Sequence, residues 1–342
     1  MPSPEELFGN KTGTDTPRVT LERNDDSEDI VLEKCYRNPR PILVTAHALG
    51  FGVYRKTDER SNTGLIQMFE DSELWNEVGY ENTLTRDHRI ELGQEVRLTR
   101  TDKTSPKFLE EHSDFDDLIL FKKFDDKDAQ SEWIAQEIIK NLKEDDLTAK
   151  DIIVINPDPI KTKNEVAKVR AILFEQGYIS HIAGETNANV FYVDDISITF
   201  TGIYRAKGNE ASMVYVMNAQ DCYDSFNELQ TVRNRLFTAM TRSKGWVRVT
   251  GVGEKMDLLS KEYNLVRENN FDLHFYYPNK EELALIQTIN RDKTAAEKRT
   301  IDDANKGILK ILESIKSGQL TGFDIDLSAD DRELLLQHIK KD

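Results

Sequence analysis

The chain has few of the residues that mark disulfide-rich, metal-binding or membrane proteins. Its 342 residues include two cysteines, Cys35 and Cys222, which give neither a disulfide framework nor a zinc-ligand spacing. The six histidines show no zinc spacing either. No apolar run approaches the length of a membrane span, and the start, MPSPEELFGN, has neither the basic nor the apolar region of a signal peptide. We therefore expect a reduced, cytoplasmic protein with no membrane partner.

Two phosphate-handling patterns are also absent from the sequence. No G-x-x-x-x-G-K-[ST] occurs; the run 9–13, GNKTG, lacks the Gly-Lys-Ser/Thr ending and has no preceding strand. No predicted strand ends in an Asp-Glu pair suited to Mg²⁺, and the nearest sequence, at 193–195, is predicted to be a turn. On its own the chain should therefore not hydrolyse ATP at an appreciable rate.

Acidic residues outnumber basic ones. Lysine and arginine total 46 and aspartate and glutamate total 62, so the net charge is 46 − 62 = −16. A protein that coats nucleic acid would be basic overall, and this balance argues against that class. A local basic groove is still compatible with it, because electrostatic steering depends on where the charges lie.

Hydrophobic periodicity predicts an α/β layer fold with a mostly parallel sheet flanked by helices. The run 152–155 is apolar on both faces, as central parallel strands usually are. Other predicted strands and helices alternate along the chain: strands at 118–121, 179–182, 196–200, 213–217 and 247–250, and helices at 129–142, 164–176 and 228–240.

The same patterns divide the chain into three parts. Residues 1–30 are polar and predicted to be a flexible lead-in, and residues 31–255 form the main domain. Within it, residues 56–114 read as an inserted mixed segment, with Trp75 expected to be buried. Residues 256–342 are predicted to be a mainly helical C-terminal extension, including helices at 296–317 and about 330–340.

A short basic turn at 204–210, YRAKGNE, lies between two predicted strands. Gly208 allows a ligand to approach the backbone closely, and Lys207 and Arg205 can contact phosphate oxygens. Glu210 can accept hydrogen bonds from ribose hydroxyls. An ordinary solvated hairpin or loop explains these residues equally well, because a short basic turn is a weak signal.

Two further arginine-bearing segments each allow a ligand-binding interpretation and a purely structural one. In the helix predicted over 231–243, Arg235 and Arg242 fall within about 20° of each other on a 100° wheel, beside the apolar stripe. Either could enter a cleft at the sheet edge, or simply complement the helix C-terminus. Arg37 stands just before a helix and could reach a phosphate, or could be a surface arginine beside a proline turn.

Together, in this order, the three segments resemble the C-terminal, second RecA-like domain of superfamily 1 helicases of the UvrD/Rep/PcrA type. CYRNPRPILVTAHAL is similar to the family's motif IV, TGIYRAKGNEASMVYVMNA to motif V, and VRNRLFTAMTRSKGWVRVTG to motif VI, the most specific of the three. The resemblance covers about residues 30–55 and 115–255. It does not extend to 55–115 or to the C-terminal tail.

The resemblance implies a role for each matching residue. Arg37 matches the motif IV arginine that contacts the γ-phosphate, and Arg242 matches the motif VI arginine finger. Glu210 matches the motif V glutamate on the nucleotide sugar, with Lys207 and Gly208 beside it. The nucleic-acid-facing part of motif V corresponds to Thr201, Tyr204 and Arg205, although the family usually has histidine where this chain has Tyr204; tyrosine can still bond a phosphate or stack on a base.

The family holds its phosphate loop and Mg²⁺ ligands in a first RecA-like domain, so the chain resembles a helicase fragment. The implied cofactor is ATP with Mg²⁺, the metal being held by that missing N-terminal domain. The implied partners are that domain and a single-stranded or duplex nucleic acid, expected to be DNA rather than RNA. The alternative is a non-catalytic RecA-like module for nucleic-acid binding or assembly, and a defence-system ATPase is a weaker third reading.

Overall fold

The computed structural model describes residues 37–55, 64–69, 71–101, 103–185, 191–193, 196–225 and 228–290, with side chains to 286, and a few scattered positions after residue 300. The predicted lead-in at 1–30, Cys35, the turn at 194–195, and nearly all of the helices predicted at 296–317 and 330–340 lie outside these residues. The first compact unit of the chain ends at Asn290, and the fold described below is that unit.

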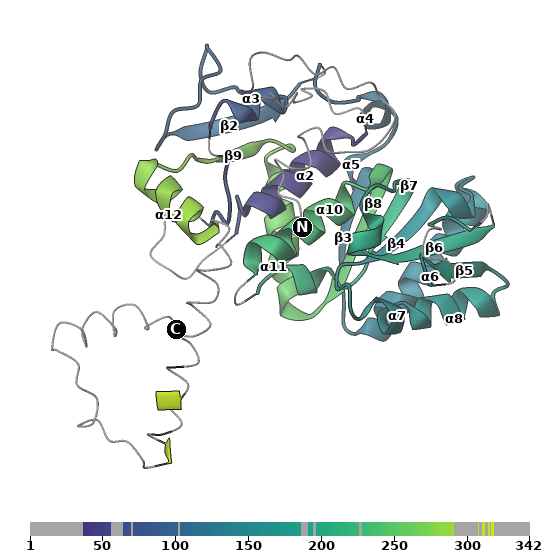
Figure 1. Cartoon of the computed structure of the whole chain (residues 1–342). Coiled ribbons are helices and arrows are strands. Elements are labelled where there is room, and N and C mark those ends of the chain that lie inside the picture. The colour runs from purple at the N-terminus through teal and green to yellow at the C-terminus, as the bar shows by residue number, and fades with distance from the viewer. Residues whose placement is uncertain are drawn as a thin grey trace, which may run out of the picture. The chain divides into compact units, whose positions relative to one another are not determined.

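Six parallel strands form the main sheet, as the sequence predicted (Figure 1). Their spatial order is β3-β8-β7-β4-β6-β5. Every side chain of the central strand β4 is buried because helices cover both faces of the sheet. The bounds are β3 (Ile119–Phe124), β4 (Ile152–Asn156), β5 (Ile179–Ile182), β6 (Ser197–Gly202), β7 (Ala211–Val216) and β8 (Ser243–Val252).

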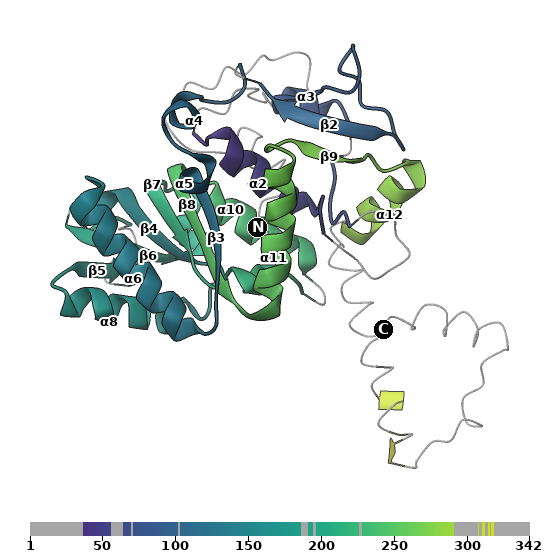
Figure 2. The ribbon, with the colours of Figure 1, turned by 180° about the vertical axis from the view of Figure 1, so that it is seen from behind.

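One face of the sheet is covered by helices that follow β3 and β4 (Figure 2). They are α6 (Lys127–Glu144), α7 (Thr162–Glu165) and α8 (Ala167–Glu175). Asp126 caps α6, its carboxylate accepting a bond from the Ala129 amide at 2.8 Å. The single helix predicted over 164–176 is wrong in detail: α7 ends at Glu165 and α8 starts at Ala167. Gly177, with a φ of 84°, ends α8 as predicted.

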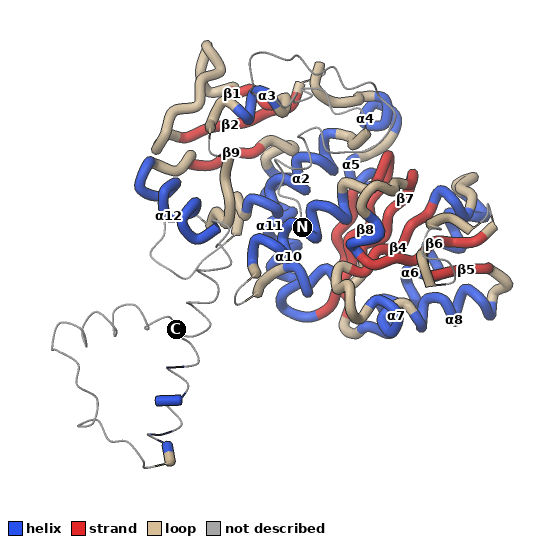
Figure 3. Tube along the Cα trace, in the orientation of Figure 1, coloured by secondary structure: helices blue, strands red, loops and turns tan. Residues whose placement is uncertain are grey.

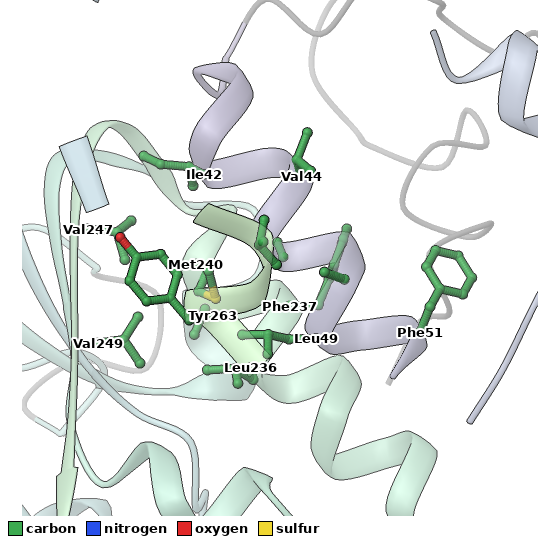
Figure 4. Packing of buried hydrophobic residues seen from close by; sticks show 14 of the residues in the cluster. Ile42, Val44, Leu49, Phe51, Leu236, Phe237, Met240, Val247, Val249 and Tyr263 are labelled. Atoms are coloured by element: carbon green, nitrogen blue, oxygen red, sulfur yellow. The ribbon is translucent and has the colours of Figure 1, made fainter. Parts of the chain in front are cut away.

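The opposite face is covered by α2 (Arg40–Phe51), α10 (Leu229–Met240) and α11 (Gly253–Glu268). Figure 4 shows α2 packed across α10, with Leu49 and Phe237 between the two helices and Val247 of β8 to one side, near Tyr263. Leu49, Phe237 and Val247 are each at most 1% exposed, and burying such a side chain is worth about 1.5–3 kcal/mol. This packing attaches the segment that follows Arg37 to the sheet.

A small antiparallel sheet joins two distant parts of the chain (Figure 3). It contains β1 (Tyr80–Asn82) and β2 (Glu95–Arg100) from the predicted insertion, and β9 (Leu273–Tyr276) from the predicted extension. Trp75, on α3 (Leu74–Glu77), is fully buried as expected and belongs to the same core as α2 and α10. Residues 256–290 thus continue the compact unit. The remaining helices are α4 (Phe108–His112), α5 (Phe115–Leu118), α9 (Ile203–Ala206) and α12 (Lys280–Asn290).

A buried ion pair links α10 to α11. The Arg233 guanidinium donates two bonds to the Glu262 carboxylate, at 3.0 and 2.8 Å, and the two side chains are 0% and 4% exposed. Arg233 also donates to the backbone carbonyls of Tyr223, at 3.1 Å, and Leu49, at 3.3 Å. One side chain therefore ties α10, α11, α2 and the loop after β7 together.

Removing Glu262 alone should be costly, because it leaves an arginine charge buried without its partner. We expect Glu262→Leu to lower the free energy of unfolding by about 3–5 kcal/mol, measured by urea denaturation. The double variant Arg233→Met with Glu262→Leu should recover most of that loss, since it leaves no charge behind. A double variant as unstable as the single one would contradict this account.

Candidate functional site

The register of β7 against β8 brings Glu210 and Arg242 together. Ala211 pairs with Ser243 at the amino ends of these parallel strands, and the Ala211 amide donates to the Arg242 carbonyl at 3.1 Å. Glu210 and Arg242 are the residues just before that pair. Two residues that are far apart in the sequence therefore enter the sheet side by side.

Asn38 brings Arg37 to the same place. Asn38 is 3% exposed, and its side-chain amide donates to the carbonyls of Thr241, at 3.3 Å, and Ser243, at 2.6 Å. Arg37 itself donates to the Thr241 carbonyl at 3.5 Å. Sequence reasoning missed Asn38, and its position between Arg37 and the proline turn was the only available signal.

A carboxylate lies between two cations at the centre of this site. Glu210 Oε2 is 2.8 Å from Arg37 Nε, and Glu210 Oε1 is 3.1 Å from Lys244 Nζ. The three side chains are 37%, 37% and 52% exposed, so solvent reaches all of them. Lys244 was not among the predicted site residues; the sequence offered only its place directly after the TRS segment.

Arg242 is the buried member of the group. It is 6% exposed, and its Nε donates to the Thr238 carbonyl at 3.2 Å. Burial, and secondly the nearby Arg37, lower the pKa of Arg242 to about 10, while Glu210 acts in the opposite direction. The guanidinium stays charged at neutral pH, and it is held where water screens its charge poorly.

The prediction that Arg235 and Arg242 share one helix flank is wrong. Helix α10 ends at Met240, so the helical wheel does not extend to Arg242, which lies in the turn at the amino end of β8. Arg235 instead lines a cavity of about 290 Å³ beyond the carboxyl ends of the strands, together with Pro157, Asp158, Lys161, Gln220, Asp221, Cys222, Asp224 and Lys255. The two arginines therefore lie at opposite edges of the sheet.

The hairpin interpretation of the basic turn is also wrong. Strands β6 and β7 are not neighbours, because each pairs in parallel with β4. Residues 203–210 therefore cross from the carboxyl edge of the sheet to its amino edge. Lys207 and Gly208 are exposed on this crossing, and Gly208 has a φ of 88° with no atom within 4 Å of a built Cβ. The backbone at Gly208 is therefore open to solvent.

The residues predicted to contact nucleic acid lie where this crossing begins. Tyr204 is 57% exposed, and Arg205 is exposed with its guanidinium against Gly184, where any Cβ would overlap it. Thr201 differs: it is fully buried in β6, and its hydroxyl donates to the Gly202 carbonyl at 3.1 Å. In this arrangement Thr201 supports the turn and presents no surface to a nucleic acid.

Within the ranges that the structure describes, no group of three or more histidine, cysteine, aspartate or glutamate side chains could hold a metal ion. The helices in those same ranges include none that is long and apolar enough to cross a bilayer.

Cys222 is buried beside the carboxyl-edge cavity, at 1% exposure. Burial, followed by the nearby Asp221, raises the pKa of the Cys222 thiol to about 12. Because the thiolate is the reactive form, this cysteine is suited to packing rather than to chemistry.

This environment should make Cys222 slow to modify. In a Cys35→Ser chain at pH 8, we expect a thiol-exchange reagent such as DTNB to label the native protein at least about 100-fold more slowly than the urea-unfolded protein. The ratio of the two labelling rates, followed by absorbance, is the measurement. Equal rates would show that Cys222 is accessible and ionised in the fold.

One family of known proteins matches part of this chain. A family model described as the UvrD-like helicase C-terminal domain matches residues 197–250, the stretch from β6 to β8 that contains Glu210 and Arg242. No curated protein matches the chain. Among solved structures, the C-terminal domain of a possible DNA helicase from Lactobacillus plantarum WCFS1 is 18% identical, with 42% of this chain and 78% of that chain covered and a TM-score of 0.31. The family match confirms the resemblance to the C-terminal helicase domain for residues 197–250.

Proposed function

We propose that this chain, whose residues 197–250 match the C-terminal domain of UvrD-like helicases, supplies one wall of an ATP site in a DNA helicase or translocase. The observation that carries the proposal is the grouping of Arg37, Arg242 and Glu210 at the amino ends of β7 and β8. These residues come from three separate segments. The resemblance assigns each of them to contact with the nucleotide.

The charge of the group suits a polyphosphate. Two arginines and Lys244 face a single carboxylate, Glu210, so the site has an excess of positive charge. Lys207 and Gly208, exposed on the neighbouring crossing, offer a further cation and an open backbone. The residues present therefore fit the phosphates of ATP. Mg²⁺ and the phosphate loop would come from the other wall of the cleft, on a first RecA-like domain.

Arginine side chains are the chemical contribution of this wall. Hydrolysis of ATP builds negative charge on the equatorial oxygens of the transferred phosphoryl group, and an arginine supplied from a second domain is worth ~10³–10⁵ in rate in related enzymes. The burial of Arg242 strengthens its interaction with that charge, since the local dielectric is low. Arg37, at 37% exposure, would contribute less per contact.

Nucleic acid would approach the other end of residues 203–210, at the carboxyl edge of the sheet. There the exposed ring of Tyr204 offers a stacking surface, and the exposed Arg205 offers a phosphate contact. Residues 203–210 connect this end directly to Glu210. A shift of that segment on DNA binding would therefore be transmitted to the ATP wall, which is how such a domain would couple the two ligands.

Arg242 should be essential for turnover. In the protein that joins this chain to a domain with a phosphate loop, we expect Arg242→Ala to reduce DNA-stimulated ATP hydrolysis by ~10³-fold or more, measured as kcat in a phosphate-release assay. Arg267→Ala is the matched control, because Arg267 sits in a surface ion pair with Asp116 at 2.6 Å. Unchanged turnover in the Arg242 variant would overturn the helicase proposal and favour the non-catalytic module.

Tyr204 should contribute to nucleic-acid affinity. We expect Tyr204→Ala to weaken binding of a single-stranded oligonucleotide to this chain by about tenfold, since stacking of a base on an aromatic ring is worth about 1–3 kcal/mol. Fluorescence anisotropy at fixed salt is the measurement. The control is Tyr276→Ala, a tyrosine of the small sheet with a similar exposure of 64%. Equal affinity in both variants would remove Tyr204 from the nucleic-acid surface.

A further inference from the structure

The cations of the proposed nucleotide site are already paired with a carboxylate of the same chain. Glu210 accepts Arg37 Nε at 2.8 Å and Lys244 Nζ at 3.1 Å. Arg37 donates a further bond from Nη1 to the Thr241 carbonyl. The Nε edge of the Arg37 guanidinium, which could otherwise form a paired contact with an anion, is therefore taken up by a carboxylate.

The backbone of Glu210 is held separately from its side chain. The Tyr192 hydroxyl donates to the Glu210 carbonyl at 2.6 Å. Burial, together with the Glu210 charge, raises the pKa of Tyr192 to about 12, so the hydroxyl remains a donor at neutral pH. On the other side, the Ala211 amide bonds to the Arg242 carbonyl. The Glu210 side chain can therefore change partners while its backbone stays in place.

The energetics of the two ion pairs permit such an exchange. Both pairs are more than one-third exposed, and ion pairs at that exposure contribute little to stability. Arg242 lies within electrostatic reach of both partners. After burial, the charge of Arg37 is the next cause that lowers the pKa of Arg242, and the charge of Glu210 raises it. Without Glu210, three cations would face one another with no anion among them.

From these contacts we propose that Glu210 takes the place of the phosphate anion while the site is empty, and that Lys244 is a third polyphosphate-contacting cation beside Arg37 and Arg242. A polyphosphate chain displaces the Glu210 carboxylate from Arg37 and Lys244. The displaced carboxylate is then free to turn toward the sugar. This inference rests on the proposed function, because it concerns the same site.

Binding of inorganic tripolyphosphate to this chain tests the inference directly. The probe carries the charge of the nucleotide without its sugar or base, so it reports the exchange alone. Glu210→Gln removes the competing carboxylate and should tighten binding by about two- to fivefold, the range expected for exposed ion pairs. Lys244→Gln removes a contact and should weaken binding by a similar factor. Calorimetric titration at two salt concentrations gives both affinities.

Two variants with the same charge changes elsewhere serve as controls. Glu185→Gln removes a carboxylate from an exposed ion pair with Lys163, at 3.0 Å. Lys255→Gln removes a cation beside the carboxyl-edge cavity. Both should bind tripolyphosphate as the unaltered chain does. Urea denaturation of all four variants checks that the fold is retained.

The outcomes separate this inference from the proposal on which it rests. Suppose that Arg37→Gln and Arg242→Gln abolish binding, but Glu210→Gln leaves the affinity unchanged or lower. The displacement inference is then wrong, while the proposal that these residues contact a nucleotide is supported. If Arg37→Gln and Arg242→Gln bind as the unaltered chain does, the wall itself is wrong. Failure of Glu210→Gln to bind tripolyphosphate at all also overturns the inference, because that variant should expose three cations.

Discussion

The parallel pairing of β7 with β8 is the constraint on which the site depends. It fixes Ala211 opposite Ser243, so that the residues preceding both strands must lie together. The pairing is itself stabilised by helices on both faces, since Val214 and Val247 belong to one core and Met213 and Tyr215 to the other. A one-residue slip in register would turn these side chains to the wrong faces. Packing in the centre of the sheet thus determines the geometry at its edge.

The fold was largely predictable because its strongest signals are local. Strand β4 is apolar at successive positions, and only a strand covered on both faces tolerates that pattern. Two of the failures involve where the chain turns and which strands pair, which the local pattern does not give. The wheel that placed Arg235 beside Arg242 assumed a helix that continues past Met240, whereas the chain turns there to enter β8. The hairpin interpretation assumed that β6 and β7 are neighbours, but β4 lies between them.

The site was predictable in its residue types and less so in its contacts. Arg37, Glu210 and Arg242 could be proposed from the three collinear motifs, and their grouping follows from the topology. Asn38 and Lys244 were not found, because an asparagine before a proline and a lysine on a charged surface have no distinctive pattern. Only the positions of the Thr241 carbonyl and the Glu210 carboxylate give these two residues a role. The net charge of −16 also conceals a local concentration of cations.

The small sheet has a consequence for how the chain can be divided. Strand β2 lies between β1 and β9, and β9 comes from residues that follow the last helix of the main sheet. A protein cut after residue 255 would lose β9 and expose the backbone amides and carbonyls along one side of β2. Unpaired strand edges of that kind recruit other chains. The shortest fragment that keeps the edge of β2 paired therefore extends beyond the region of family resemblance, at least through Tyr276.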